Sequence, residues 1–220
     1  MIAKVKSCGL MGVDGYIVDV EVDISSGLPS FDIVGLPDAA VRESKERVRA
    51  AIKNCNLRFP VKRVTINLAP AHIKKEGPSF DLPITIATLI ASEQLNINHV
   101  ETYMFLGELS LSGELRPING VLPMAIAAQR CGIKNIILPV HNAYEAAVVK
   151  GIKVFPANNL YEIVMHLTGE KPLEPFEIDI DKYFSSNIRY DVDFSDVKGQ
   201  ENVKRALEIA AAGAHNCLML

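Results

Sequence analysis

Hydrophobic and polar residues alternate near the beginning of the chain. The alternation is clearest from Tyr16 to Ile24, in the run YIVDVEVDI. A period of two is typical of a strand that buries one face. Two shorter apolar runs, Ile2 to Ser7 and Ser30 to Val34, flank this one beyond turns at 12–15 and 25–29. The sequence therefore predicts three strands, and antiparallel pairing is the simplest outcome because the connections between them are short.

A helical period follows these strands. Apolar or small residues recur every three or four positions from 40 to 52, and Asp38 stands where an N-cap is expected. The pattern predicts a helix that ends near Asn54. Residues three or four positions apart share a helix face. One such face carries four cations: Arg42, Lys45, Arg49 and Lys53.

Strand and helix patterns alternate in the rest of the first 168 residues. The predicted strands are 63–68, 104–109, 135–138 and 153–155, with a hairpin return at 113–117, and the predicted helices are 82–93, 121–130, 142–149 and 160–167. Mixed strands first and alternation later indicate an α+β or α/β domain, here residues 1–168, whose helices cover a sheet.

The pattern changes after residue 168. Residues 169–193 contain two prolines and many acidic residues without a sustained period, which is typical of a linker. A helix at 200–213 and an apolar strand at 217–220 follow. Residues 194–220 therefore look like the start of a second domain, and we expect the sequence to be part of a longer protein.

Composition indicates a soluble, cytoplasmic protein. The chain has 220 residues, of which 49% are hydrophobic, enough for one sizeable core. Its beginning lacks a signal-peptide pattern, and its longest apolar run is too short to cross a bilayer. The four cysteines are far apart, and neither they nor the five histidines have the spacing of a metal site.

Charge is distributed unevenly although the formal net charge is only −3. The segment 41–75 contains ten Lys and Arg residues against two Glu, whereas 170–196 contains eight acidic residues against three basic ones. The basic segment, which also includes Arg58, Lys62 and Arg63, is suited to a polyanion. A solvated face partly neutralised by Glu43 and Glu46 explains it equally well.

The segment KKEGPSFDLP, residues 74–83, presents a serine on a Gly-Pro turn before an apolar helix. Ser79 is a candidate nucleophile, but it also stands where an N-cap is expected, as does Asp81. A third interpretation places an anion site at the helix start, with help from Lys74 and Lys75.

Two motifs resemble the proteolytic domain of the Lon family: KEGPSFDLP at 75–83 and GELSLSGELRPINGVLPMAIAAQRCGIKNIILP at 107–139. The resemblance covers about residues 1–167. It implies a two-layer sandwich of mixed sheet and helices, of the type found in ribosomal proteins and GHMP kinases. It also implies that Ser79 occupies the place of the nucleophile.

A Ser-Lys hydrolase needs a neutral lysine to accept the serine proton. In the Lon pattern this lysine lies four residues after the second glycine of the Pro-Ile-Gly-Gly turn. Counting from Gly120 leads to Met124, which cannot accept a proton. We therefore expect no peptidase activity, and a working Ser-Lys peptidase remains an alternative to be tested.

The sequence is still more similar to the ComM/YifB family of Mg-chelatase-like AAA+ ATPases. The segments that carry this resemblance are GLMGVDGYIVDVEVDISSGLPSFDIVGLPDAAVRESKERVRAAI at 9–52 and DFSDVKGQENVKRALEIAAAGAHNCLML at 193–220. In that family a Lon-like domain precedes an AAA+ module, which implies that residues 194–220 hold that module's first helix and strand.

The family resemblance implies a hexameric, ATP- and Mg²⁺-dependent motor acting on DNA, associated with branch migration in natural transformation. The Lon-like domain would then be a non-proteolytic scaffold for DNA contact or oligomerisation, with Arg42, Lys45, Arg49, Lys53, Lys74 and Lys75 as candidate DNA contacts. Val197 and Gly199 are candidates for the adenine side of a nucleotide site. No Gly-x-x-x-x-Gly-Lys-Ser/Thr loop occurs in the 220 residues, so we expect this chain alone to bind no cofactor and to hydrolyse no ATP. A magnesium-chelatase motor subunit is a further alternative.

Overall fold

A computed structural model describes residues 2–97, 99–179 and 192–220. The chain divides into two compact units, Met1–Ile178 and Asp179–Leu220. Each unit is described by itself below.

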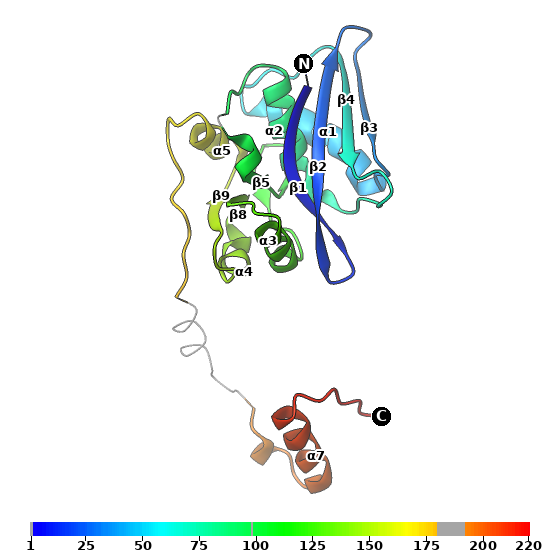
Figure 1. Cartoon of the computed structure of the whole chain (residues 1–220), viewed down its shortest axis with the longest axis vertical. Coiled ribbons are helices and arrows are strands. Elements are labelled where there is room, and N and C mark those ends of the chain that lie inside the picture. Colours follow the sequence, from blue (N-terminus) through cyan, green and yellow to red (C-terminus); the bar gives the residue numbers. More distant parts are fainter. Residues whose placement is uncertain (1, 98, 180–191) are drawn as a thin grey trace. The chain divides into compact units, whose positions relative to one another are not determined.

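The first unit is built on a seven-stranded sheet in the order β3-β4-β2-β1-β5-β8-β9 (Figure 1). The strands are β1 (Ile2–Met11), β2 (Asp14–Ser25), β3 (Ser30–Val34), β4 (Arg63–Ala69), β5 (Tyr103–Phe105), β8 (Asn135–Pro139) and β9 (Lys153–Ala157). β2 pairs antiparallel with β1 and β4, while the other four pairings are parallel. A separate small hairpin joins β6 (Glu108–Leu109) to β7 (Leu115–Arg116). The expected mixed α/β architecture is confirmed.

Helices cover both faces of part of this sheet. They are α1 (Ala39–Asn54), α2 (Asp81–Ala91), α3 (Val121–Arg130), α4 (Ala143–Ala147) and α5 (Leu160–Leu167), with short 3-10 turns η1 (Pro78–Phe80), η2 (Val100–Thr102) and η3 (Val140–Asn142). The N-cap predicted at Asp38 is confirmed, because its Oδ1 accepts a hydrogen bond of 2.8 Å from Val41 N.

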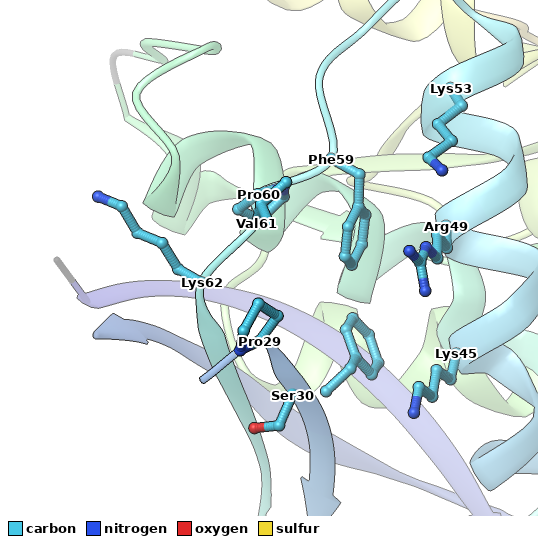
Figure 2. A pocket seen from close by; sticks show the side chains of 10 residues that line it. Pro29, Ser30, Lys45, Arg49, Lys53, Phe59, Pro60, Val61 and Lys62 are labelled. Atoms are coloured by element: carbon cyan, nitrogen blue, oxygen red, sulfur yellow. The ribbon is translucent and has the colours of Figure 1, made fainter. Parts of the chain in front are cut away.

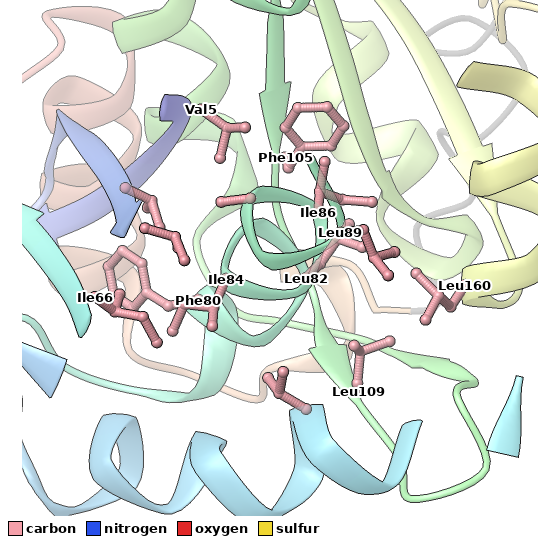
Figure 3. Packing of buried hydrophobic residues seen from close by; sticks show 14 of the residues in the cluster. Val5, Ile66, Phe80, Leu82, Ile84, Ile86, Leu89, Phe105, Leu109 and Leu160 are labelled. Atoms are coloured by element: carbon pink, nitrogen blue, oxygen red, sulfur yellow. The ribbon is translucent and has the colours of Figure 1, made fainter. Parts of the chain in front are cut away.

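Two hydrophobic cores lie on opposite faces of the sheet. Along β5 and β8, alternate side chains enter different cores: Phe105 and Ile137 pack with α2, whereas Met104 and Ile136 pack with α3 and α4. Figure 3 shows α2 in the centre of the first core, with Leu82, Ile84, Ile86 and Leu89 meeting side chains from the surrounding elements. The sequence predicted a two-layer sandwich, but α3 and α4 form a further layer on the face of the sheet opposite α2.

Three sequence-based predictions about strands are wrong. β3 pairs in parallel with β4, because α1 carries the chain across before β4 begins. The strand predicted at 104–109 is divided at Gly107, whose φ is +156° and whose N–H donates to Ser79 O. No strand forms at 217–220, because the unit contains no neighbouring strand among its described residues.

The predicted linker is structured in its first part. Leu173 N donates to His166 Nδ1 at 2.9 Å, and Phe176 N donates to Val154 O at 2.7 Å. Residues 170–178 therefore belong to the first unit. Residues 180–191 of the predicted linker lie outside the described residues.

Among its described residues, the second unit contains one 3-10 turn, η4 (Phe194–Asp196), and one helix, α7 (Glu201–Ala212). Asp193 caps the turn, since its carboxylate accepts from Ser195 N while its own N–H donates to Asp196. The helix matches the prediction at 200–213 to within one residue at each end.

Candidate functional site

Three of the four predicted cations of α1 line a groove on the first unit. Lys45, Arg49 and Lys53 form one side, and the segment 59–62 faces them across it (Figure 2). The groove has a volume of about 140 Å³, and Pro29, Ser30 and Phe31 of the β2–β3 region complete its lining. We call this the α1 groove. Arg42 lies on the same helix but does not line the groove.

The cations of the α1 groove have no carboxylate partners among the described residues. Among the described residues, Glu43 is the one acidic residue of α1 that lies within salt-bridge distance of a cation. Its partner, at 3.8 Å, is Arg47, which does not line the groove. The ion pairs of the described residues therefore do not join Glu43 or Glu46 to the cations of the groove, as partial neutralisation of this face would require. An anion entering the groove would meet unpaired positive charge.

Aromatic side chains support the groove from below. The Phe31 and Phe59 rings lie 5.7 Å apart, and the guanidinium of Arg49 lies 5.7 Å from the centre of the Phe59 ring. Such a cation–π contact orders the guanidinium without using its hydrogen-bond donors. Arg49 thus remains able to bind an anion.

A buried ion pair connects α1 to the start of α2. Arg47 Nε donates to Asp81 Oδ2 at 2.6 Å, and Leu109 N donates to the same oxygen at 3.1 Å. Asp81 is fully buried. Burial raises the pKa of its carboxyl, and the hydrogen bonds from Arg47 oppose that rise. The pair therefore ties α1, α2 and the β6–β7 hairpin together.

The structure brings Ser79 and Met124 to one cavity, which we call the Ser79 cavity. Its volume is about 330 Å³, and its walls come from β1, η1, β6 and α3. The lining residues are Leu10, Glu76, Gly77, Pro78, Ser79, Glu108, Pro117, Ile118, Asn119 and Met124. Within the described chain this lining contains no lysine or histidine, so the cavity lacks the lysine that a Ser-Lys hydrolase needs.

The capping predictions for Ser79 and Asp81 are wrong. α2 begins without a side-chain cap, because Asp81 bonds to Arg47 and Leu109 instead. Ser79 lies one turn earlier, in η1, and is 6% exposed. Its Oγ forms no hydrogen bond with any described residue, whereas its backbone oxygen accepts from Gly107.

The two lysines before this loop differ from one another. Lys74 is exposed, and its Nζ lies 2.7 Å from Glu76. Lys75 is fully buried, and its ammonium donates to the carbonyls of Pro70 and Ile73. Burial lowers the pKa of Lys75. The expectation that Lys75 contacts DNA is therefore wrong, since its side chain does not reach the surface.

The candidate nucleotide residues lie in the second unit, between η4 and α7. Val197 is 44% exposed, and Gly199 has a φ of +69°. Both therefore occupy a turn before a helix, as the sequence indicated. Whether they meet adenine stays a prediction.

Sequence reasoning missed the apolar parts of both sites. Phe31 and Phe59 are distant in sequence from the cations of α1 and carry no motif, and Leu10 is distant from Ser79. Arg47 was grouped with the basic segment, although it faces inward. The spacing of Arg47 could have indicated this inward orientation, because Arg47 lies off the helix face formed by Arg42, Lys45, Arg49 and Lys53.

The described residues contain neither a cluster of metal-ligating side chains nor a membrane-spanning helix. No group of three or more His, Cys, Asp or Glu side chains is arranged to hold a metal ion. None of the described helices has both the length and the apolar character needed to cross a membrane.

Comparison with known proteins gives matches in both units. The family model of subunit ChlI of Mg-chelatase matches residues 20–142. A second model, magnesium chelatase subunit ChlI, matches residues 193–220.

Individual relatives extend these matches over the whole chain. The chain is 42% identical to the competence protein ComM of Haemophilus influenzae over 221 residues, covering 100% of this chain and 43% of ComM. It is 44% identical to the uncharacterised protein YifB of Escherichia coli over 211 residues, covering 96% of this chain and 40% of YifB. Lon protease 2 of Bacillus subtilis is a more distant relative, 25% identical over 189 residues, with 76% of this chain and 33% of the protease covered. The chain thus spans less than half the length of these relatives.

Proposed function

Because this chain belongs to the ComM/YifB family of Mg-chelatase-like proteins, we propose that it is the front part of an ATP-driven DNA motor. In this proposal the first unit has a Lon-like fold, cuts no peptides and contacts the sugar-phosphate backbone. Its contact surface is the α1 groove. Its partner is DNA in a branched or recombining state, as expected of a motor for branch migration.

The unpaired cations of the α1 groove are the observation that carries this proposal. Lys45, Arg49 and Lys53 are each four residues apart, which corresponds to about 6 Å of helix rise per step. A row of cations with this spacing can follow successive phosphates along one strand. Phosphate contacts supply affinity without reading sequence, which suits a motor that must act on any DNA.

The proposal is tested by replacing Lys45, Arg49 and Lys53 with Ala together. Binding of a labelled four-way DNA junction is followed by fluorescence anisotropy at several salt concentrations. The affinity falls with added salt, and each lost phosphate contact should reduce the magnitude of the slope of log K against log salt by about one. For the triple variant we expect a reduction of about two to three.

Three exposed lysines away from the groove provide a matched control. Replacing Lys134, Lys150 and Lys153 with Ala removes the same formal charge from the same unit. This control should keep the salt slope of the unchanged chain. Equal losses in both triple variants would show that general charge, not the α1 groove, attracts the DNA and would defeat the proposal.

ATP and Mg²⁺ enter the proposal through the second unit, because residues 193–220 match the magnesium chelatase model. In the whole protein, Val197 and Gly199 would lie beside adenine. The motor would assemble as a homo-oligomer, a hexamer in this proposal. The full-length protein should therefore hydrolyse ATP faster when a DNA junction is present, and absence of any stimulation would contradict a DNA-driven cycle.

A motor subunit of magnesium chelatase is a second candidate, supported by the names of the two matching family models. It predicts that the full-length protein promotes insertion of magnesium into a porphyrin by partner subunits. The two candidates are separated by measuring ATP hydrolysis with DNA and with porphyrin, since only the true partner should increase the rate.

A further inference from the structure

We propose that residues 170–178 form a strap on the first unit, which His166 holds closed while its ring is neutral and releases when the ring is protonated. The strap shares no residue with the α1 groove, so this inference is independent of the DNA-motor proposal. Along the chain the strap leads toward the second unit. Its release would therefore lengthen the free connection between the units by up to about 3.3 Å for each freed residue.

A few backbone hydrogen bonds and two apolar side chains attach the strap. Lys171 N donates to Met165 O at 3.0 Å, and Phe176 N donates to Val154 O at 2.7 Å. Leu173 packs against the core around α2, whereas Phe176 packs against the core around α3 and α4. The strap thus passes around β9, the edge strand of the sheet. An attachment of this size can open locally while the core stays folded.

His166, in the last turn of α5, is the side chain that bonds to the strap. Its Nδ1 accepts a hydrogen bond of 2.9 Å from Leu173 N. A ring nitrogen that accepts a hydrogen bond carries no proton, so the proton of the neutral ring is on Nε2. Protonation of Nδ1 would turn this acceptor into a donor, and two N–H groups would then face one another. The closed strap therefore requires the neutral ring.

The surroundings of the ring also disfavour its charged form. The centre of the His166 ring lies 4.9 Å from that of Phe155 and 6.0 Å from that of Tyr103. Burial lowers the pKa of His166 below its ordinary value of 6.5. Nε2 is buried without a hydrogen-bond partner among the described residues, and a buried donor without a partner costs free energy. Both features weaken the closed state, as expected of a contact that opens.

No charged neighbour in the described chain compensates for protonation of His166. The titratable groups on the elements packed around the ring are Tyr103 on β5, Lys153 on β9, Tyr161 and Glu162 on α5, and Glu170, Lys171, Glu174 and Glu177 in the strap. The side chains of these residues form no hydrogen bond or ion pair with the ring. Glu162 bonds instead to Asn158 N at 2.8 Å and to Asn159 Nδ2 at 3.1 Å.

The direction of the pH dependence follows from these contacts. With the strap open, the ring is in water and titrates near its ordinary pKa of 6.5, whereas the closed strap keeps it neutral to lower pH. The closed state therefore binds fewer protons, and its stability is fully present above about pH 6.5 and is lost as the pH falls toward the lowered pKa. In this window the ratio of open to closed strap should rise by up to about tenfold per pH unit.

The first test uses a fluorescent reporter in the strap. The chain contains no tryptophan, so Phe176→Trp introduces a single one. Its emission is recorded from about pH 7.5 to about pH 5. Opening should move the emission to longer wavelength as the indole enters water, and the change should develop below about pH 6.5.

Two histidine substitutions in the reporter chain identify the group that titrates. His166→Asn removes the titration but supplies an amide oxygen that can accept from Leu173 N, so the emission change should disappear. His72→Asn is the matched control, because His72 is an exposed histidine in the loop after β4. It should leave the emission change as it is.

Hydrogen exchange followed by mass spectrometry tests the unsubstituted chain, and it decides the matter if the reporter itself loosens the strap. After correction for the intrinsic effect of pH on exchange, peptides from 170–178 should exchange up to about tenfold faster one pH unit below 6.5. Peptides from α2 should not change.

Three outcomes would overturn the inference. The first is unchanged exchange of 170–178 across this pH range. The second is an emission change that persists in His166→Asn. The third is faster exchange in α2 together with the strap, which would indicate general acid unfolding rather than release of one segment.

Discussion

The α1 groove and the Ser79 cavity belong to the same unit but differ in how their charges are paired. In the groove, Lys45, Arg49 and Lys53 have no carboxylate partner among the described residues, whereas in the cavity Glu76 and Glu108 each have a cation. The groove is therefore suited to an anion and the cavity to an apolar group. Ion-pair partners, more than local composition, decide what a charged segment can bind.

Breaking the buried ion pair between Arg47 and Asp81 should destabilise both the α1 groove and the Ser79 cavity. Arg47→Ala leaves the fully buried Asp81 without its cation, and loss of one partner of a buried pair costs about 3–5 kcal/mol. Urea unfolding followed by circular dichroism measures this loss.

The Asp81→Ala variant and the double variant complete a thermodynamic cycle. If the pair acts as a unit, the double variant should be less destabilised than the sum of the single variants. Additive effects would show that Arg47 and Asp81 contribute independently.

A comparison of two arginines on α1 sharpens the definition of the groove. Arg49 lines it and Arg42 does not. Arg49→Ala should reduce affinity for a DNA junction by about fivefold and lower the salt slope by about one. Arg42→Ala should have a smaller effect in the same anisotropy titration, and an equal effect would extend the interface along the whole stripe.

Asp38 connects α1 to the loop before Ser79, and its contribution to stability should be smaller than that of the Arg47–Asp81 pair. Its carboxylate accepts from Val41 N at 2.8 Å and from Gly77 N at 3.2 Å, so it caps α1 and holds the loop before Ser79. Asp38→Ala should cost about 1 kcal/mol of stability in denaturant unfolding. Asp38→Asn keeps an acceptor and should restore most of it; failure of that rescue would point to a need for the charge.

Ser79→Ala should have the smallest effect on stability. Because Ser79 Oγ has no hydrogen bond among the described residues, removing it should change the free energy of unfolding by less than about 0.5 kcal/mol. A loss near 1 kcal/mol in the same denaturant assay would show that the hydroxyl caps a helix after all.

Local patterns predicted most of the first unit correctly. The helices at 121–130 and 160–167 and the strand at 30–34 match the structure to the residue, and the Asp38 cap is confirmed. These elements carry strong periods or cap signals within a few residues. The errors occurred where a distant partner intervened: α2 lacks the expected cap because Arg47 binds Asp81, and the strand at 104–109 divides because Gly107 approaches Ser79.

The sequence by itself determined the family, the basic face of α1 and the replacement of the expected lysine by Met124, because each depends only on residue identity and spacing. Only the tertiary structure decided that Lys75 is buried while Lys74 is exposed, that Phe59 lies under Arg49, and that Leu10 lines the Ser79 cavity. Burial and pairing depend on which distant segments meet, and no local pattern encodes that meeting.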